Sequence, residues 1–259
     1  MCLLVIGWRA HRRYRLVVAA NRDEFHDRPA APLGWWSPRP GARLLGGRDL
    51  RAGGTWLALD RERRFGIVTN FRDLQRSAPD APSRGALIPD YLMQPRCARD
   101  FLAQLEPAAA RYAGFNLLLT DDASLWYASN RAAPFARELE PGIYGLSNHL
   151  LDTPWPKLAR VRGAFARWLA ADPSPPPDEL LAMLADRAPA EAHEGSLPDT
   201  GLSSEWERVL SSPFVLHPRY GTRCSSVVLL EPSGAGLVIE RRFDASGAVT
   251  GEAQEALRA

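Results

Sequence analysis

The chain has 259 residues, of which 46% are hydrophobic and 24% are charged, and its formal net charge is +2 at pH 7. This length and apolar content suffice to bury a sizeable core, so we predict a single domain over 1–259. The near-neutral charge argues against a nucleic-acid partner, which needs a concentrated basic face. Since no apolar run approaches the roughly 18 residues of a membrane-crossing helix, no membrane span is expected.

The first predicted elements are two strands, Cys2–Ile6 and Arg15–Ala20, because each is a short and mainly apolar run. A polar stretch separates them, so they should pair antiparallel. If Trp8 faces Tyr14, constant register brings the start of the first strand opposite the end of the second. Asp23 would then lie a few residues beyond the strand end and could curl back over the start of the chain.

The next segment, 41–54, contains two glycine pairs, which predict a tight loop beside a pocket. It lacks the Gly-Lys-Ser/Thr ending of a phosphate-binding P-loop. We interpret Arg48 and Asp49 in this loop as candidate substrate contacts. Trp56, just after it, is a candidate for lining an apolar ligand site, with simple core packing as the alternative.

Further strands and helices follow in blocks. Short apolar runs predict strands over Thr55–Asp60, Arg64–Asn70, Gly114–Thr120, Ser124–Ala128, Ile143–Ser147, Cys224–Leu230 and Gly236–Phe243. Apolar residues at helical spacing predict helices around 87–92 and 101–105, from Pro156 to Leu169, and over Asp178–Ala185. Strands, then helices, then strands again favour an α+β layered sandwich over a doubly wound sheet.

Cysteine as the second residue suggests a nucleophile. Methionine is generally removed before so small a residue, which would leave Cys2 with a free α-amine of pKa about 8, able to accept the thiol proton. Asp23 would hold this amine and adjust its basicity. The alternative is that Cys2 is a small buried hydrophobe and Asp23 a turn residue.

The three cysteines, Cys2, Cys97 and Cys224, form no Cys-x-x-Cys pair and are odd in number. This argues against a disulfide framework or a zinc knuckle and fits a reducing compartment. The first apolar run is followed, not preceded, by basic residues, unlike a signal peptide. A cytoplasmic location is therefore expected.

Several motifs together resemble one family. They are Met1-Cys2-Leu3-Leu4-Val5, Asn21-Arg22-Asp23-Glu24-Phe25, Gly46-Gly47-Arg48-Asp49, Gly53-Gly54-Thr55-Trp56, Val68-Thr69-Asn70, Leu146-Ser147-Asn148 and Gly221-Thr222-Arg223-Cys224-Ser225. In this order they resemble the NRDE family, also called transport and Golgi organization 2, over residues 1 to about 230. The resemblance implies the fold of N-terminal-nucleophile hydrolases, a four-layer αββα sandwich. Relatives with a terminal cysteine include choloylglycine hydrolases, penicillin V acylases and acid ceramidase.

The resemblance also implies roles for site residues. Asp23 would orient the α-amine of Cys2, and Arg22 would stand in for an arginine that these hydrolases carry three residues before the aspartate, where this chain has Ala20. Arg223 resembles the arginine placed next to the cysteine, where a fixed cation would lower the thiol pKa.

Two asparagines complete the expected site. Asn148 follows a strand-like run and would donate its amide N–H to a tetrahedral oxyanion, an interaction worth roughly 3 kcal/mol of barrier. Asn70 resembles the residue that lies beside the nucleophile. The ordinary alternative is that both are turn residues at strand ends.

The expected function is hydrolysis or acyl transfer at an amide or ester of a small or acyl-lipid substrate, through a Cys2 thioester and without a cofactor. The alternative comes from the family, which is associated with Golgi organisation, lipid homeostasis and haem trafficking. It is a non-catalytic carrier or chaperone that would bind haem or an acyl-lipid in the same pocket. Haem titration and acyl-enzyme trapping would distinguish the two.

Overall fold

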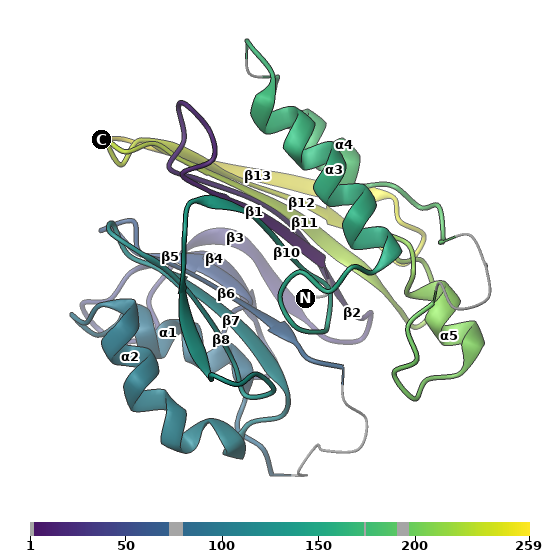
Figure 1. Cartoon of the computed structure of the whole chain (residues 1–259), viewed down its shortest axis with the longest axis horizontal. Helices are drawn as coiled ribbons and strands as arrows, with labels where there is room; N and C mark the ends of the chain where they lie inside the picture. The colour runs from purple at the N-terminus through teal and green to yellow at the C-terminus, as the bar shows by residue number, and fades with distance from the viewer. Residues whose placement is uncertain (1–2, 73–79, 174, 191–196) are drawn as a thin grey trace. The chain divides into compact units, whose positions relative to one another are not determined.

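The computed structural model describes residues 3–72, 80–173, 175–190 and 197–259 (Figure 1). These residues form two compact units. The first contains the chain from its start to Asp27, together with Pro141–Ser147 and Leu151–Ala259. The second contains Arg28–Glu140 and the short segment Asn148–Leu150. Whether the chain is one folding domain stays a prediction.

The first unit is built on a six-stranded antiparallel sheet in the order β10-β1-β2-β11-β12-β13. Its strands are β1 (Leu3–Trp8), β2 (Leu16–Phe25), β10 (Gly142–Leu146), β11 (Tyr220–Leu230), β12 (Gly236–Phe243) and β13 (Val249–Leu257). The central strands β1, β2 and β11 are almost continuously buried.

Helices cover one face of this sheet. They are α3 (Pro156–Ala170) and α4 (Asp178–Leu184). A further short helix, α5 (Ser204–Val209), precedes β11 in the chain. Helix α3 lies against β1 and β10, and α4 lies against β2 and β11 (Figure 1). Phe165 of α3 and Leu180 of α4 are fully buried and share a core with Val17 and Ala19 of β2. Helix α3 begins at Pro156, where the missing N–H of proline removes no helical hydrogen bond.

The second unit is built on a seven-stranded antiparallel sheet whose strands follow in chain order, β3 to β9. They are β3 (Ala30–Trp36), β4 (Leu44–Asp49), β5 (Leu57–Leu59), β6 (Phe65–Asn70), β7 (Phe115–Thr120), β8 (Leu125–Ser129) and β9 (Ala136–Leu139). Two 3₁₀ turns, Arg84–Ala86 and Glu106–Arg111, flank helices α1 (Leu87–Leu92) and α2 (Ala98–Leu105). Helix α1 packs on β5 and β6, and α2 packs on β8 and β9.

The predicted strands and helices are found close to their expected positions, but several elements were not foreseen. The prediction of a loop over 41–54 is wrong for Leu44–Asp49, which forms β4. A Cβ at Gly46 would come within 2.3 Å of the Leu57 carbonyl oxygen, so this glycine allows β5 to approach β4 closely. Strands β3, β9 and β13 and helix α5 were also missed. The mostly exposed β13 lacks a sustained apolar alternation.

The predicted register of the first hairpin is also corrected. Trp8 lies opposite Leu16 rather than Tyr14, and Leu3 lies opposite Asn21. Strand β2 does not end at Ala20 but continues to Phe25, because β11 supplies a hydrogen-bonding partner along its whole length. Asp23 is therefore a strand residue and does not lie in a turn beyond the strand.

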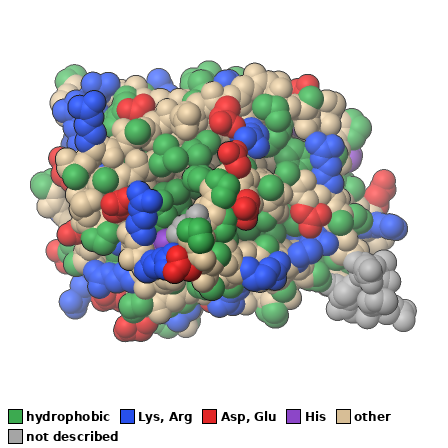
Figure 2. All heavy atoms as spheres, turned by 90° about the horizontal axis from the view of Figure 1, so that it is seen from above, with side chains coloured by type: hydrophobic (Ala, Val, Ile, Leu, Met, Phe, Trp, Pro, Cys, Tyr) green, Lys and Arg blue, Asp and Glu red, His purple; other side chains and the backbone are tan. Residues whose placement is uncertain are grey.

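The predicted α+β class is confirmed by two antiparallel sheets, each with helices packed on it. None of the helices in residues 3–72, 80–173, 175–190 and 197–259 is both long and apolar enough to cross a membrane. On the face drawn in Figure 2, acidic and basic side chains are interspersed.

Candidate functional site

The site residues expected in the first unit gather where β1, β2 and β11 run side by side. Cys2, the expected nucleophile, lies outside the described residues. Its neighbour in sequence, Leu3, is fully buried and pairs with Asn21 of β2. The residues that follow Asn21 are therefore on the strand next to the one that Leu3 begins.

Asn21 is a fully buried side chain with three hydrogen bonds. Its amide nitrogen donates to the carbonyl oxygens of Leu184 (2.8 Å) and Pro213 (2.9 Å). Its amide oxygen accepts from the hydroxyl of Ser225, at 2.6 Å. Asn21 thus ties β2 to β11, to the end of α4 and to the segment that precedes β11.

Asp23 is 1% exposed, and its carboxylate is held from β11. The hydroxyl of Thr222 donates to Oδ1 of Asp23 at 2.6 Å. The same hydroxyl accepts from the backbone N–H of Val215 at 2.9 Å, which fixes its rotation. The carboxylate is therefore locked in one orientation within the sheet, and an amine is the kind of partner that such a buried acid favours.

Arg22 projects to the opposite face of β2 from Asp23, since successive strand residues alternate. It is 3% exposed, and its guanidinium lies 3.8 Å from the carboxylate of Glu24. Its register partner on β11 is Cys224, a buried free cysteine. Burial raises the pKa of the Cys224 thiol well above its ordinary value; nearby Glu240 raises it further, and Arg22 opposes the shift.

Arg223 occupies an irregularity in the pairing of β11 with β2, between Thr222 and Cys224. Its guanidinium donates to the carbonyl oxygens of Phe25 (3.0 Å) and His26 (2.9 Å). Arg223 therefore binds the backbone at the C-terminal end of β2. Its expected effect on the nucleophile stays a prediction.

In the second unit the structure brings Asn70 and Asn148 together, although 78 positions separate them in the sequence. The amide nitrogen of Asn148 donates to the carbonyl oxygen of Asn70 at 3.0 Å. The carbonyl oxygen of Asn148 accepts from the backbone N–H of Arg72 at 2.8 Å. Asn148 has a φ of 60°, a left-handed conformation that asparagine tolerates better than most residues.

The hydrogen-bonding capacity of Asn148 is only partly used. A side-chain amide carries two N–H donors, of which Asn70 takes one. The amide oxygen is buried and has no hydrogen-bond partner among the described residues. The side chain is 4% exposed and keeps a donor for a further acceptor, as the expected oxyanion role requires.

Asn116 is a residue of this region that the sequence interpretation missed. It is fully buried in β7 and donates to the hydroxyl of Thr69 (3.2 Å) and the carbonyl oxygen of His149 (2.9 Å). It accepts from the hydroxyl of Tyr127 at 2.8 Å. An asparagine inside the run Phe-Asn-Leu-Leu-Leu-Thr was the available signal, because a buried amide in a strand needs partners.

His149 lies against the ring of Phe71, with 4.9 Å between the ring centroids. Burial lowers the pKa of its imidazole. The segment Asn148–Leu150 is therefore attached to the second sheet through Asn70, Arg72 and Asn116.

Asp49 ends β4 and organises the turn after it. Its Oδ1 accepts from the backbone N–H groups of Arg51 (2.9 Å) and Ala52 (3.1 Å). Its Oδ2 lies 2.7 Å from Nε of Arg28 in an ion pair. These contacts explain the conformation of the turn, and the expected substrate role of Asp49 stays a prediction.

The other two expected substrate contacts differ in exposure. Arg48 is exposed, and its guanidinium lies 5.3 Å from the ring centre of Trp36. Trp56 is 6% exposed and contributes to the buried interior of the second unit. The expected role of Trp56 in lining a ligand site stays a prediction.

Comparison with known proteins identifies the family. Residues 1–245 match the family model described as Transport and Golgi organisation 2. The chain belongs to this family. The mouse Transport and Golgi organization 2 homolog is 32% identical to it over 243 residues, covering 88% of this chain and 86% of the mouse protein. The human homolog is also 32% identical, with the same coverage, and the Drosophila melanogaster protein is 27% identical, covering 84% and 82%.

Solved structures show the fold of this Transport and Golgi organisation 2 member. The mutant C2A conjugated bile acid hydrolase from Clostridium perfringens superposes with a TM-score of 0.52, covering 99% of this chain and 92% of the hydrolase at 7% identity. An N-acylethanolamine-hydrolyzing acid amidase ortholog from Caenorhabditis elegans gives a TM-score of 0.46 at 9% identity, covering 89% and 93%. The likeness to the bile acid hydrolase shows that the fold is of the N-terminal-nucleophile hydrolase type, as the family resemblance implies.

Proposed function

We propose that this Transport and Golgi organisation 2 protein is an N-terminal-cysteine hydrolase that cleaves an amide or ester of a small or acyl-lipid substrate. The observation that supports this most is the buried carboxylate of Asp23, which lies on β2, the strand beside β1, and accepts a hydrogen bond from Thr222 of β11. Leu3, which follows Cys2 in the sequence, pairs with Asn21, two residues before Asp23.

The proposed chemistry begins with removal of Met1. The thiol of Cys2 gives its proton to the α-amine, and the thiolate attacks the substrate carbonyl carbon. Collapse of the tetrahedral intermediate breaks the bond to the leaving amine or alcohol, which takes the proton from the α-ammonium, and a thioester remains. Water then attacks the thioester, with the α-amine as base, and releases the acid and the thiol. The reaction uses protein groups and water only.

Asp23 is assigned to the α-amine. A carboxylate that stays fixed through the cycle can orient the amine and stabilise its protonated form, which exists after each proton transfer. Thr222 acts through Asp23 by fixing its orientation. Asn148 is assigned to oxyanion stabilisation because one of its amide N–H groups is not needed by Asn70.

The fold likeness adds support at the level of class. The bile acid hydrolase with a similar fold was solved as a C2A mutant, so its second residue is also a cysteine in the unmutated protein.

The test combines the mature N-terminus with acyl-enzyme trapping. Mass spectrometry of protein from its native host should show that Met1 is absent. Incubation with a panel of acyl amides and thioester trapping should then give an adduct on Cys2. The adduct and turnover should disappear in Cys2→Ala and persist in Cys97→Ala, which removes an exposed cysteine.

Two variants examine the supporting residues. Asn148→Gly keeps the left-handed backbone accessible and removes the amide, so kcat should fall about 100-fold or more. Asp23→Asn should depress acylation at every pH. An intact Met1, or full turnover by Cys2→Ala, would refute the hydrolase. A Soret band on haem titration without any acyl-enzyme would favour the carrier alternative.

A further inference from the structure

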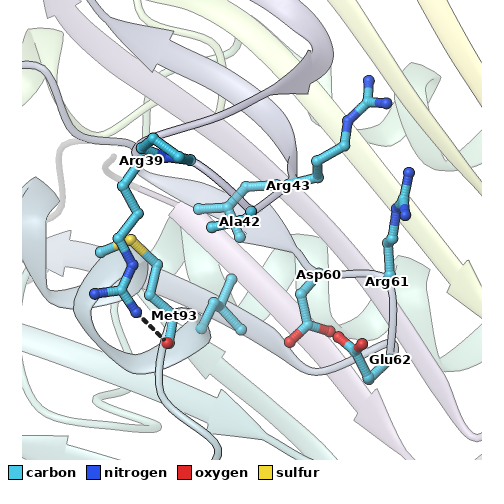
Figure 3. A pocket seen from close by; sticks show the side chains of 11 residues that line it. Arg39, Ala42, Arg43, Asp60, Arg61, Glu62 and Met93 are labelled. Carbon is cyan, nitrogen blue, oxygen red and sulfur yellow. Dashed lines mark hydrogen bonds between the residues drawn. The ribbon is translucent and has the colours of Figure 1, made fainter.

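A second candidate site lies within the second unit, in a cavity of about 220 Å³ (Figure 3). Three elements form its walls: the connection from β3 to β4, the turn from β5 to β6, and the end of α1. None of the residues named for the hydrolase lines this cavity. The side chains that give it its charge are Arg39, Arg43, Arg61, Asp60 and Glu62.

The three arginines leave positive charge available to a ligand. Figure 3 shows the guanidinium groups of Arg43 and Arg61 on the same side of the cavity. Among the described residues, Arg61 has no hydrogen bond or ion pair from its guanidinium, and Arg43 contacts only the ring of Trp35, at 5.9 Å from the ring centre. Arg39 donates to the carbonyl oxygen of Met93 at 2.7 Å, a neutral acceptor that leaves its charge uncompensated.

The acidic groups do not cancel this charge. Asp60 is 3% exposed and forms an ion pair with Arg64, whose Nε lies 2.7 Å from Oδ2 of Asp60. The backbone N–H of Arg64 donates to the other carboxylate oxygen at 2.9 Å. The charge of Asp60, which lines the cavity, is therefore balanced by Arg64. Among the described side chains that line the cavity, the carboxylate of Glu62 is then the one negative charge left to balance the guanidinium groups of Arg39, Arg43 and Arg61.

The remaining lining is apolar and the volume is small. Ala42, Leu44, Leu92 and Met93 contribute hydrocarbon surface. A volume of about 220 Å³ suits a small ligand, since it lies below the roughly 300–1,000 Å³ of drug-sized ligand sites. Cationic groups beside a short apolar wall fit a ligand with an anionic head and a short hydrocarbon body.

We propose that this cavity binds a small organic anion, with a carboxylate or phosphate group on Arg43 and Arg61 and its apolar body against Ala42 and Met93. Guanidinium groups form charge-assisted hydrogen bonds with both kinds of head group. The arginine pair supplies the affinity, and the apolar wall selects against inorganic ions. Arg39, held by the Met93 carbonyl, contributes a fixed cation at the other wall.

The experiment is a calorimetric titration of the full-length protein with four probes. Butyrate and ethyl phosphate carry the two head groups, butyramide has the shape of butyrate without its charge, and butylammonium reverses the charge. We expect saturable binding of butyrate, ethyl phosphate or both, with the stronger one naming the head group. Butyramide and butylammonium should bind at least about tenfold more weakly.

Variants locate the binding. Arg43→Gln with Arg61→Gln should weaken the anion at least about tenfold, whereas Arg99→Gln, which removes an exposed arginine of α2 outside the cavity, should not. Ala42→Leu should weaken the organic anions by filling the apolar wall. The proposal is overturned by a lack of saturable binding, by equal losses in Arg99→Gln, or by a preference for butylammonium. Circular dichroism confirms that each variant is folded.

Discussion

The buried amide of Asn21 should be among the most costly side chains to remove. Asn21→Ala deletes a fully buried group with three hydrogen bonds and leaves the carbonyl oxygens of Leu184 and Pro213 without their donor. Each unsatisfied buried acceptor costs about 1–3 kcal/mol, whereas the hydroxyl of Ser225 can rotate to another acceptor. The expected loss in the free energy of unfolding is therefore about 4 kcal/mol, a large part of the roughly 5–15 kcal/mol of a typical domain.

The assay is equilibrium unfolding in urea, followed by tryptophan fluorescence, for the wild type, Asn21→Ala and Ser225→Ala. Ser225→Ala removes one of the three hydrogen bonds and leaves both carbonyl contacts in place, so it should cost about 1 kcal/mol. In the double variant the two losses should fall short of additivity, because the residues share a bond. The reasoning is refuted if Asn21→Ala costs no more than Ser225→Ala.

Three further predictions concern reactivity and pH. In the Cys2→Ala background, a thiol reagent at pH 8 should label the exposed Cys97 quickly. Cys224 should react only when the protein unfolds, because burial raises the pKa of its thiol. Rapid labelling of two thiols in the folded protein would contradict this prediction. An amine-reactive ester should modify only the α-amine, as checked by peptide mapping. Lys157, the single lysine of the chain, is 2% exposed and donates to the carbonyl oxygen of Leu210. Adducts at Lys157 in the folded protein would count against this prediction. The pKa of His149 is lowered in the folded protein, so the unfolded state binds the imidazole proton more tightly. The free energy of unfolding should therefore fall as the pH drops below about 6.5. His149→Gln should make stability, measured by thermal unfolding, less dependent on pH in this range.

Much of the local structure could be predicted from the sequence, because apolar runs mark buried strands wherever they occur. The strands at 3–8, 65–70 and 115–120 and the helix from Pro156 follow from such patterns. The hairpin register was wrong by two residues. Arg9 adopts a φ of 47°, and its N–H bonds to the carbonyl oxygen of Arg15, which shortens the paired part of the hairpin. Nothing in the polar turn indicated that conformation.

The candidate site, too, could be predicted only in part from the sequence. Asp23, Asn70 and Asn148 were chosen from the sequence, and the structure supplies each with specific hydrogen bonds. Asn116 and Thr222 were not chosen, although Asn116 fixes the segment after Asn148 and Thr222 fixes Asp23. Their partners lie 33 and 199 positions away, so a local pattern carries no information about them.

By itself the sequence determined the family, the apolar strands and the chemical types available for a nucleophile, an acid and an amide donor. Only the tertiary structure decided that Asn21–Asp23 is part of a strand, because the hydrogen bonds that extend β2 come from β11, about 200 residues later. It also decided that Asn148 sits on the end of β6. The physical reason is that buried polar side chains must find partners, and those partners are chosen by the packing of distant segments rather than by their neighbours in the chain.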